Sequence, residues 1–265
     1  MQQPTFATKH PYRFTALLMA AIVLVYLAAG TAAALLKLPA SNTSGVFLLA
    51  NLALAILGAA LLTGLRWWRV VGFRAPAEPR DLLLYWLPCA LVLVNLASGV
   101  ALGFAQLGVG RVAYFVAMTG LLGFVEEVFF RGLILRALAP HGLWRAALVS
   151  AVLFGVAHAL NALSGANPFA IALQIGYALA IGFGFAAVTL RTGILWPLVL
   201  IHALIDFASF LVSDGASAGS PTTTDMAFTA LTIVAFMGYG IVMMRAGKPL
   251  SRAGARPLAL AEAAS

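Results

Sequence analysis

Eight long apolar runs constrain the fold of this chain more than any other feature of its sequence. Each is close to the roughly 20 residues that an α-helix needs to cross the hydrocarbon core of a bilayer. They cover residues 14–36, 46–65, 82–105, 112–138, 143–161, 170–190, 194–212 and 226–245. The runs are too long and too uniformly apolar for the alternating strands of a membrane barrel. The sequence therefore predicts an all-α, polytopic membrane protein with about eight transmembrane helices.

The composition indicates lipid rather than water as the surrounding solvent. Of the 265 residues, 63% are hydrophobic and 9% are charged, whereas average soluble domains carry about 25% charged residues. The net charge of +8 does not indicate nucleic acid, because the Lys and Arg residues lie between apolar runs rather than in one basic helix. We expect one membrane domain over residues 1–245, and a disordered cytoplasmic tail over 246–265. The expected partners are the bilayer and a protein or peptide substrate.

The distribution of basic residues predicts the orientation. With the N-terminus placed in the cytoplasm, Lys37 and Arg111 are the basic residues expected on the outer side, and nearly all others fall inside. The positive-inside rule then places both termini in the cytoplasm, and we expect an integral protein of the plasma (inner) membrane. The run at 14–36 exceeds the apolar region of an ordinary signal peptide, which favours a retained helix.

Ionisable residues inside the apolar runs are the candidates for function. A charge at the bilayer centre costs about 2.5–3.5 kcal/mol on the insertion scale, so such residues are seldom incidental. The acids and histidines concerned are Glu126, Glu127, His158, His202 and Asp206. They occur in only three of the eight runs, at overlapping depths if each residue rises about 1.5 Å. The sequence therefore predicts one polar intramembrane cavity that these residues share.

Helical geometry separates the two adjacent glutamates. At 3.6 residues per turn their side chains point about 100° apart, so we expect that Glu126 and Glu127 do not share one role. Glu127 and Arg131 are spaced i,i+4 with the acid first, the better order for an ion pair. We expect that pair to be mainly architectural, and Glu126 to face the cavity. Phe154 lies one turn before His158 and is expected to pack against it, and Pro197 is expected to kink its helix just before His202.

Three motifs in this order resemble those of a known family. They are Glu126-Glu127-x-x-x-Arg131, Phe154-x-x-x-His158 and His202-x-x-x-Asp206. The pattern is similar to that of the CPBP family, the CAAX proteases and bacteriocin-processing or self-immunity proteins, also called Abi. Its best-known branch is the type II CAAX prenyl endopeptidase. The similarity covers a core of about 112–212.

The resemblance implies an intramembrane endopeptidase with a largely helical fold. By that likeness Glu126 and His158 would activate the attacking water, while His202 and Asp206 would stabilise the oxyanion. Supporting roles would fall to Glu127, Arg131 and Phe154.

Position 206 departs from the pattern, because the prenyl endopeptidases often carry Asn there. An ionised carboxylate cannot donate a hydrogen bond to an oxyanion, whereas a protonated Asp206 could. Alternatively, Asp206 accepts from His202 and fixes its tautomer, or it binds a metal. His158, His202 and Glu126 are candidate ligands for a catalytic Zn²⁺ with an open position. The sequence contains no HExxH motif, and a metal-free glutamate mechanism is favoured over a zinc-dependent one.

Two other classes of function fit the same residues. Intramembrane Glu and His also serve as relays in proton- or ion-coupled transporters, although the sequence shows no internal repeat of the transporter kind. A non-catalytic immunity or scaffold protein could also retain the motifs. A transporter would lose transport without any peptide product when Glu126 is replaced, and a scaffold would keep its function.

Overall fold

The computed structural model describes residues 5–38, 40–102, 106–214 and 220–246, and every regular element among these residues is helical. Eight helices are long and apolar enough to cross a membrane. They cover Pro11–Leu35, Ser44–Gly64, Pro79–Ala101, Val109–His141, Leu143–Ala162, Pro168–Thr192, Trp196–Ser213 and Thr223–Arg245. Each predicted run overlaps one of them. The prediction of an all-α polytopic membrane protein is confirmed, and the chain is an integral membrane protein.

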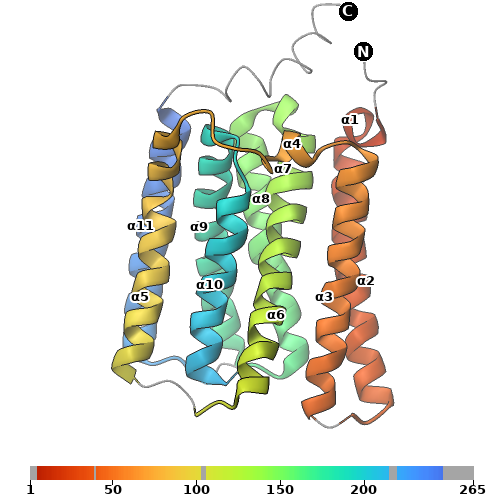
Figure 1. The fold of residues 1–265 in the computed structure, drawn as a ribbon, viewed down its shortest axis with the longest axis vertical. Helices are drawn as coiled ribbons and strands as arrows, with labels where there is room; N and C mark the ends of the chain where they lie inside the picture. The colour runs from red at the N-terminus through yellow and green to blue at the C-terminus, as the bar shows by residue number, and fades with distance from the viewer. Residues whose placement is uncertain (1–4, 39, 103–105, 215–219, 247–265) are drawn as a thin grey trace, which may run out of the picture.

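The helices stand side by side in an up-and-down bundle (Figure 1). In chain order the elements are α1 (Phe6–Lys9), α2 (Pro11–Leu35), α3 (Ala40–Gly64), α4 (Trp68–Val71), η1 (Pro79–Tyr85), α5 (Trp86–Leu102), α6 (Val109–Glu126), η2 (Glu127–Ile134), α7 (Leu135–Leu138), η3 (Ala139–His141), α8 (Leu143–Ala157), η4 (His158–Ser164), α9 (Pro168–Thr192), α10 (Trp196–Ser213) and α11 (Thr223–Arg245). Apart from Ala246, the predicted tail at 246–265 lies outside the described residues.

One end of the bundle carries most of the basic residues, and we call it the basic end. The start of α2 and the last residue of α11 both lie there, at the top of Figure 1. Arg13 is in the first turns of α2, Arg69 is in α4 and Arg245 ends α11. Lys37 follows α2 and Arg111 begins α6, at the opposite end. This segregation supports the proposal that the basic end faces the cytoplasm.

Reporter fusions should reveal this orientation. Fusions after Ala75, after Gly142 and at the C-terminus are expected to report the cytoplasm, because these points follow the basic end of the bundle. Fusions near residues 42, 165 and 218 are expected to report the other side. A paired alkaline phosphatase and fluorescent protein assay would measure both states, and an external C-terminus would contradict the arrangement.

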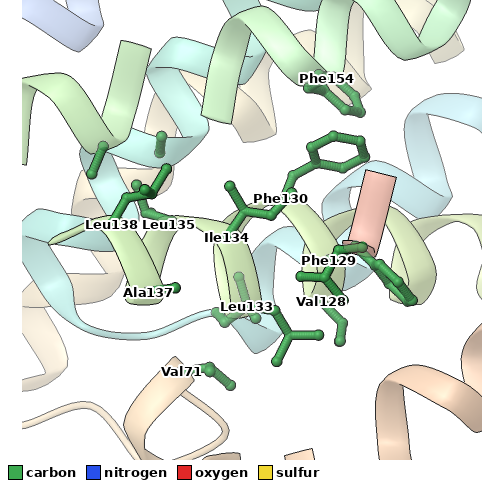
Figure 2. Packing of buried hydrophobic residues seen from close by; sticks show 14 of the residues in the cluster. Val71, Val128, Phe129, Phe130, Leu133, Ile134, Leu135, Ala137, Leu138 and Phe154 are labelled. Carbon is green, nitrogen blue, oxygen red and sulfur yellow. The ribbon is translucent and has the colours of Figure 1, made fainter. Parts of the chain in front are cut away.

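The segment formed by η2 and α7 is the centre of the bundle. Every residue from Glu127 to Leu138 is buried, whereas most of the other spanning helices have a third or less of their most apolar window buried, α9 excepted. Figure 2 shows the side chains of Val128, Phe129 and Leu133 among those that fill the surrounding core. Because this segment touches protein on all sides, charged groups on it are shielded from lipid and can be partnered by other helices.

Short local signals set the helix ends near the site. Asn167 caps α9, since its side-chain oxygen accepts from the N–H groups of Phe169 and Ala170 at 2.9 and 3.2 Å. Gly193 ends α9 with φ of 69°, a left-handed conformation that glycine adopts without strain.

The expected kink at Pro197 is wrong. Pro197 lies in the first turn of α10, where a proline breaks no hydrogen bond because its missing N–H would have no partner there.

Candidate active site

Two helical segments bring Glu126, Glu127, His202 and Asp206 together within the bundle, and a third places His158 beside Phe154. Glu126 is the last residue of α6 and Glu127 the first of η2, while His158 lies where α8 gives way to η4. His202 and Asp206 follow each other by one turn in α10. The spacing of the motifs had indicated this convergence, and the contacts show how it is organised.

His202 is the centre of the site. Its Nε2 lies 3.1 Å from Oε2 of Glu126, and its Nδ1 lies 2.8 Å from Oε1 of Glu127. Oδ2 of Asp206 is 3.8 Å from the same Nε2, which is close but too long for a hydrogen bond. One imidazole therefore has a carboxylate at each nitrogen, with a second carboxylate near Nε2.

The two adjacent glutamates occupy different places, as expected: Glu127 is sealed against Arg131 and Glu126 is partly exposed. Both nevertheless contact His202, one at each ring nitrogen, which the sequence did not indicate. The reason is local: η2 is a π-helix beginning at Glu127. A π-helix closes its hydrogen bonds over five residues instead of four, so it has more residues per turn and successive side chains diverge less. The 3.6-residue geometry used for the sequence does not hold at this point of the chain.

The predicted ion pair between Glu127 and Arg131 is confirmed. Nη1 of Arg131 donates to Oε1 of Glu127 at 2.9 Å, and both side chains are fully buried. The same Oε1 also lies 2.8 Å from Nδ1 of His202. Since the carboxylate of an ion pair can only accept, His202 donates through Nδ1. Glu127 is therefore more than architectural, because it fixes the orientation of the ring and directs Nε2 toward Glu126.

Aromatic faces complete the surroundings of Arg131. Its guanidinium carbon lies 4.0 Å from the ring centroid of Phe154 and 5.5 Å from that of Phe185. Among the described residues no hydrogen-bond partner reaches Nε or Nη2 of Arg131. The buried cation is thus held by one carboxylate and by the electron-rich faces of two rings. Phe185 could not be picked out beforehand, because it lies in an apolar part of α9.

Phe154 packs against His158 as predicted, with ring centroids 4.8 Å apart and nearly perpendicular planes. It also packs edge-on against His202, with ring centroids 5.8 Å apart. Figure 2 shows its other neighbour, Phe130, whose ring centroid is 5.2 Å away. Nδ1 of His158 lies 2.9 Å from the carbonyl oxygen of Phe154. A carbonyl only accepts, so Nδ1 carries a proton and, in the neutral ring, Nε2 of His158 is free to accept one.

The site has a sealed inner layer and an accessible outer layer. The side chains of Glu127 and Arg131 are 0% exposed, whereas Glu126 and Asp206 are 21% and 28% exposed. The two outer side chains are therefore accessible, whereas the ion pair behind them is closed off. The predicted cavity around them stays a prediction.

A close approach of α6 to α10 sets the distance between Glu126 and His202. A Cβ atom at Gly123 would lie 2.7 Å from the carbonyl oxygen of Val199 and 2.9 Å from the backbone nitrogen of Ala203. Both neighbours are backbone atoms of α10, on either side of His202 in the chain, and neither can move independently of the helix. Gly123 therefore allows Glu126 to reach His202.

Replacing Gly123 with Ala should separate α6 from α10 and lower activity. A misplacement of about 1 Å can cost about 10²-fold in rate, and overpacking costs about 1–3 kcal/mol of stability. Cleavage rate and thermal unfolding of the purified variant would measure both effects. Gly120→Ala is the matched control, because a Cβ at Gly120, one turn earlier in α6, has no atom within 4 Å. Equal activity of the two variants would contradict the role given to Gly123.

The structure favours a different metal ligand set from the one that the sequence indicated. Glu126, His202 and Asp206 each offer a ligand atom, and these atoms lie within 4.8 Å of one another. His158 does not belong to this group. One imidazole and two carboxylates suit Zn²⁺, and Glu127 on Nδ1 of His202 matches the carboxylate that usually orients a metal-bound histidine.

The bundle has eight spanning helices, and Glu, His and Asp side chains cluster between them. This combination defines the class of polytopic membrane proteins with an intramembrane site. Residues 107–208 match the family described as Type II CAAX prenyl endopeptidase Rce1-like. This segment holds all three motifs, and the match agrees with the resemblance to the CAAX proteases. No curated protein and no solved structure matches the chain.

Proposed function

We propose that this protein is an intramembrane endopeptidase that hydrolyses peptide bonds in membrane-associated protein or peptide substrates. The observation that carries the proposal is the convergence of Glu126, His202 and Asp206 within 4.8 Å, inside the segment that matches a CAAX-type endopeptidase family. We further propose that it lies in the plasma (inner) membrane with both termini in the cytoplasm.

In this proposal Glu126 and His158 activate the attacking water. Glu126 has an accessible carboxylate, and His158 keeps Nε2 available because Nδ1 donates to the carbonyl of Phe154. The water oxygen attacks the carbonyl carbon of the scissile bond as its proton passes to Glu126. The same group then returns the proton to the leaving nitrogen as the carbon–nitrogen bond breaks.

His202 and Asp206 are proposed to stabilise the oxyanion. With Nδ1 donating to Glu127, the protonated ring presents a second N–H from Nε2 toward the outer face of the site, whereas in the neutral ring Nε2 only accepts. A preorganised donor of this kind is typically worth 10²–10³-fold in rate. Asp206 can add a second donor only if it carries a proton.

A metal would change the assignment of these residues. Glu126, His202 and Asp206 would hold a Zn²⁺, which would polarise the scissile carbonyl and lower the pKa of its bound water. Glu127 would then orient His202 as a metal ligand. We propose the metal-free glutamate mechanism because the accessible carboxylate of Glu126 can act as a base and because the sequence contains no HExxH motif.

Comparison of membrane proteomes tests the proposed activity. Cells that express the wild-type protein should yield new protein termini close to membrane segments, and these should vanish with Glu126→Gln. Gly120→Ala, which has an unobstructed position in α6, should leave them unchanged. Transport changes at Glu126→Gln without any difference in termini would indicate the transporter instead, and an unaltered phenotype would indicate a scaffold or immunity protein.

Asp206→Asn should distinguish the roles open to this carboxylate. If a protonated Asp206 donates to the oxyanion, Asn should retain most activity. Activity should then no longer fall at alkaline pH, because the amide does not lose a proton there. If Asp206 acts as an anion beside Nε2 of His202, Asn should lose most activity. The pH profile of cleavage by the purified variant measures this.

A chelator provides the companion measurement for the same residue. Strong inhibition that added Zn²⁺ reverses would favour the metal-bound site, and metal content should then fall in Asp206→Asn. Unchanged activity after chelation, with less than one equivalent of metal bound, would favour the metal-free mechanism.

A further inference from the structure

The turn between α9 and α10 is held by an earlier part of the chain, the connection from α4 to α5 that includes η1. Nε of Arg74 donates to the carbonyl of Gly193 at 3.1 Å. The backbone N–H of Leu195 donates to the carbonyl of Gly72 at 3.0 Å. A side chain at Gly72 would collide with the backbone nitrogen of Leu195, so the two backbones are in close contact. In Figure 1 this connection crosses the upper end of the bundle, past the start of α10.

Tyr85, the last residue of η1, makes the buried part of this attachment. It is 2% exposed, and its hydroxyl lies 2.6 Å from the carbonyl oxygen of Ile194 and 2.8 Å from Oγ1 of Thr192. The hydroxyl of Thr192 donates to the carbonyl of Val188 at 2.8 Å, and a hydroxyl has only one hydrogen to donate. Tyr85 is therefore the donor to both oxygen atoms. It lies before the segment 107–208 that matches the family, and the proposed mechanism does not use it.

The turn also lies directly against η2, the segment that carries Glu127. Leu195 is fully buried, and a Cβ atom at Gly132 of η2 would lie 3.5 Å from its Cδ2. Seven residues further along, Nδ1 of His202 meets Oε1 of Glu127 at 2.8 Å. Seven residues are close to two turns of an α-helix, so Leu195 and His202 lie on the same face of α10. This face therefore meets η2 at two points, and the first point limits where the second can fall.

We propose that Tyr85 is a positioning residue for the candidate active site. Its hydroxyl fixes the turn before α10, the turn sets the register of α10 against η2, and that register brings Nδ1 of His202 to Glu127. Without the hydroxyl, the carbonyl of Ile194 loses its donor and the start of α10 can shift. The expected effect on cleavage rests on the proposed function, whereas the expected effect on the ring of His202 does not.

Tyr85→Phe tests the role because it removes the hydroxyl and keeps the ring. Nitrogen-15 NMR of the histidine rings, on full-length protein in detergent, should show a shifted Nδ1 signal for His202, which the loss of a signal in His202→Gln identifies. His158 is the internal control, since its Nδ1 is bonded to the carbonyl of Phe154 one turn earlier and its signal should stay. For cleavage, kcat should fall by about tenfold or more while KM stays nearly unchanged, because a misplaced ring lowers the rate more than it weakens binding.

Tyr114→Phe is the matched control variant. The hydroxyl of Tyr114 donates to the carbonyl of Ser44 at 3.1 Å, so this variant also loses a hydroxyl–carbonyl bond between two segments. That bond joins α6 to α3 and does not involve the turn before α10. Tyr114→Phe should therefore keep the wild-type signal of His202 and the wild-type rate.

Two variants of Thr192 repeat the test without changing Tyr85, and they decide it if Tyr85→Phe does not accumulate. Thr192→Val removes the second acceptor and should shift the signal of His202, whereas Thr192→Ser keeps the hydroxyl and should preserve it. An unchanged His202 signal in Tyr85→Phe and Thr192→Val would overturn the proposal, even if both variants unfold at a lower temperature. A wild-type protein that cleaves no peptide would contradict the endopeptidase, while a His202 signal that still shifts in Tyr85→Phe would support the role of Tyr85.

Discussion

Replacing Glu126 with Gln should lower the rate of peptide cleavage by about 10²–10⁴-fold, the usual loss when a well-placed general base is removed. Glutamine keeps the shape of the side chain and can still hydrogen-bond to His202, but it cannot take up a proton. The variant should insert and accumulate normally, because a neutral residue in this position costs no more than a charged one. Cleavage of a fluorogenic membrane peptide by purified protein in liposomes measures the effect.

The companion of this variant is His158→Ala. If Glu126 and His158 act on the same water, the double variant should be little slower than either single one, since residues that act as a unit are not additive. Near-normal proteolysis by purified Glu126→Gln would end the mechanism proposed here. Independent, multiplying losses would indicate that the two residues serve different steps.

Replacing Arg131 with Leu should destabilise the protein by about 3–5 kcal/mol, the cost of breaking a buried ion pair from one side. The variant leaves the carboxylate of Glu127 in a site that is closed to solvent and removes the cation that lies over the ring of Phe154. Midpoints of unfolding in detergent, and protein levels in membranes, should both fall.

Adding Glu127→Gln to Arg131→Leu should restore part of the stability, because the stranded charge disappears. It should not restore activity, because His202 loses the carboxylate that accepts from its Nδ1. A fully stable Arg131→Leu protein would contradict the importance of the pair.

Much of the fold could be read from hydropathy, because each spanning helix must be long and apolar to satisfy its backbone in lipid. The eight runs, the short connections and the segregation of basic residues followed from that requirement. The start of α10 was less predictable: Pro197 can either kink a helix or begin one, and the sequence around it does not distinguish the two.

The residues of the site could be predicted, but the contacts between them could not. Charges in lipid are rare enough that Glu126, Glu127, His158, His202 and Asp206 could be selected by their positions alone. Which of them touch depends on the π-helix at Glu127 and on the close approach at Gly123, and neither leaves a periodic signal in the sequence. The contact between Glu127 and His202, 75 residues apart, was missed for this reason.

One oxygen atom of Glu127 serves both Arg131 and His202, and this arrangement restricts how such a protein can change over time. A single substitution at Glu127 or Arg131 passes through a form with an unmatched cation or anion in a closed apolar interior. Neutral drift at these two positions therefore requires nearly simultaneous replacements. Anyone seeking an inactive but well-folded form for capturing substrates should alter the outer carboxylate at position 126 and leave the inner pair untouched.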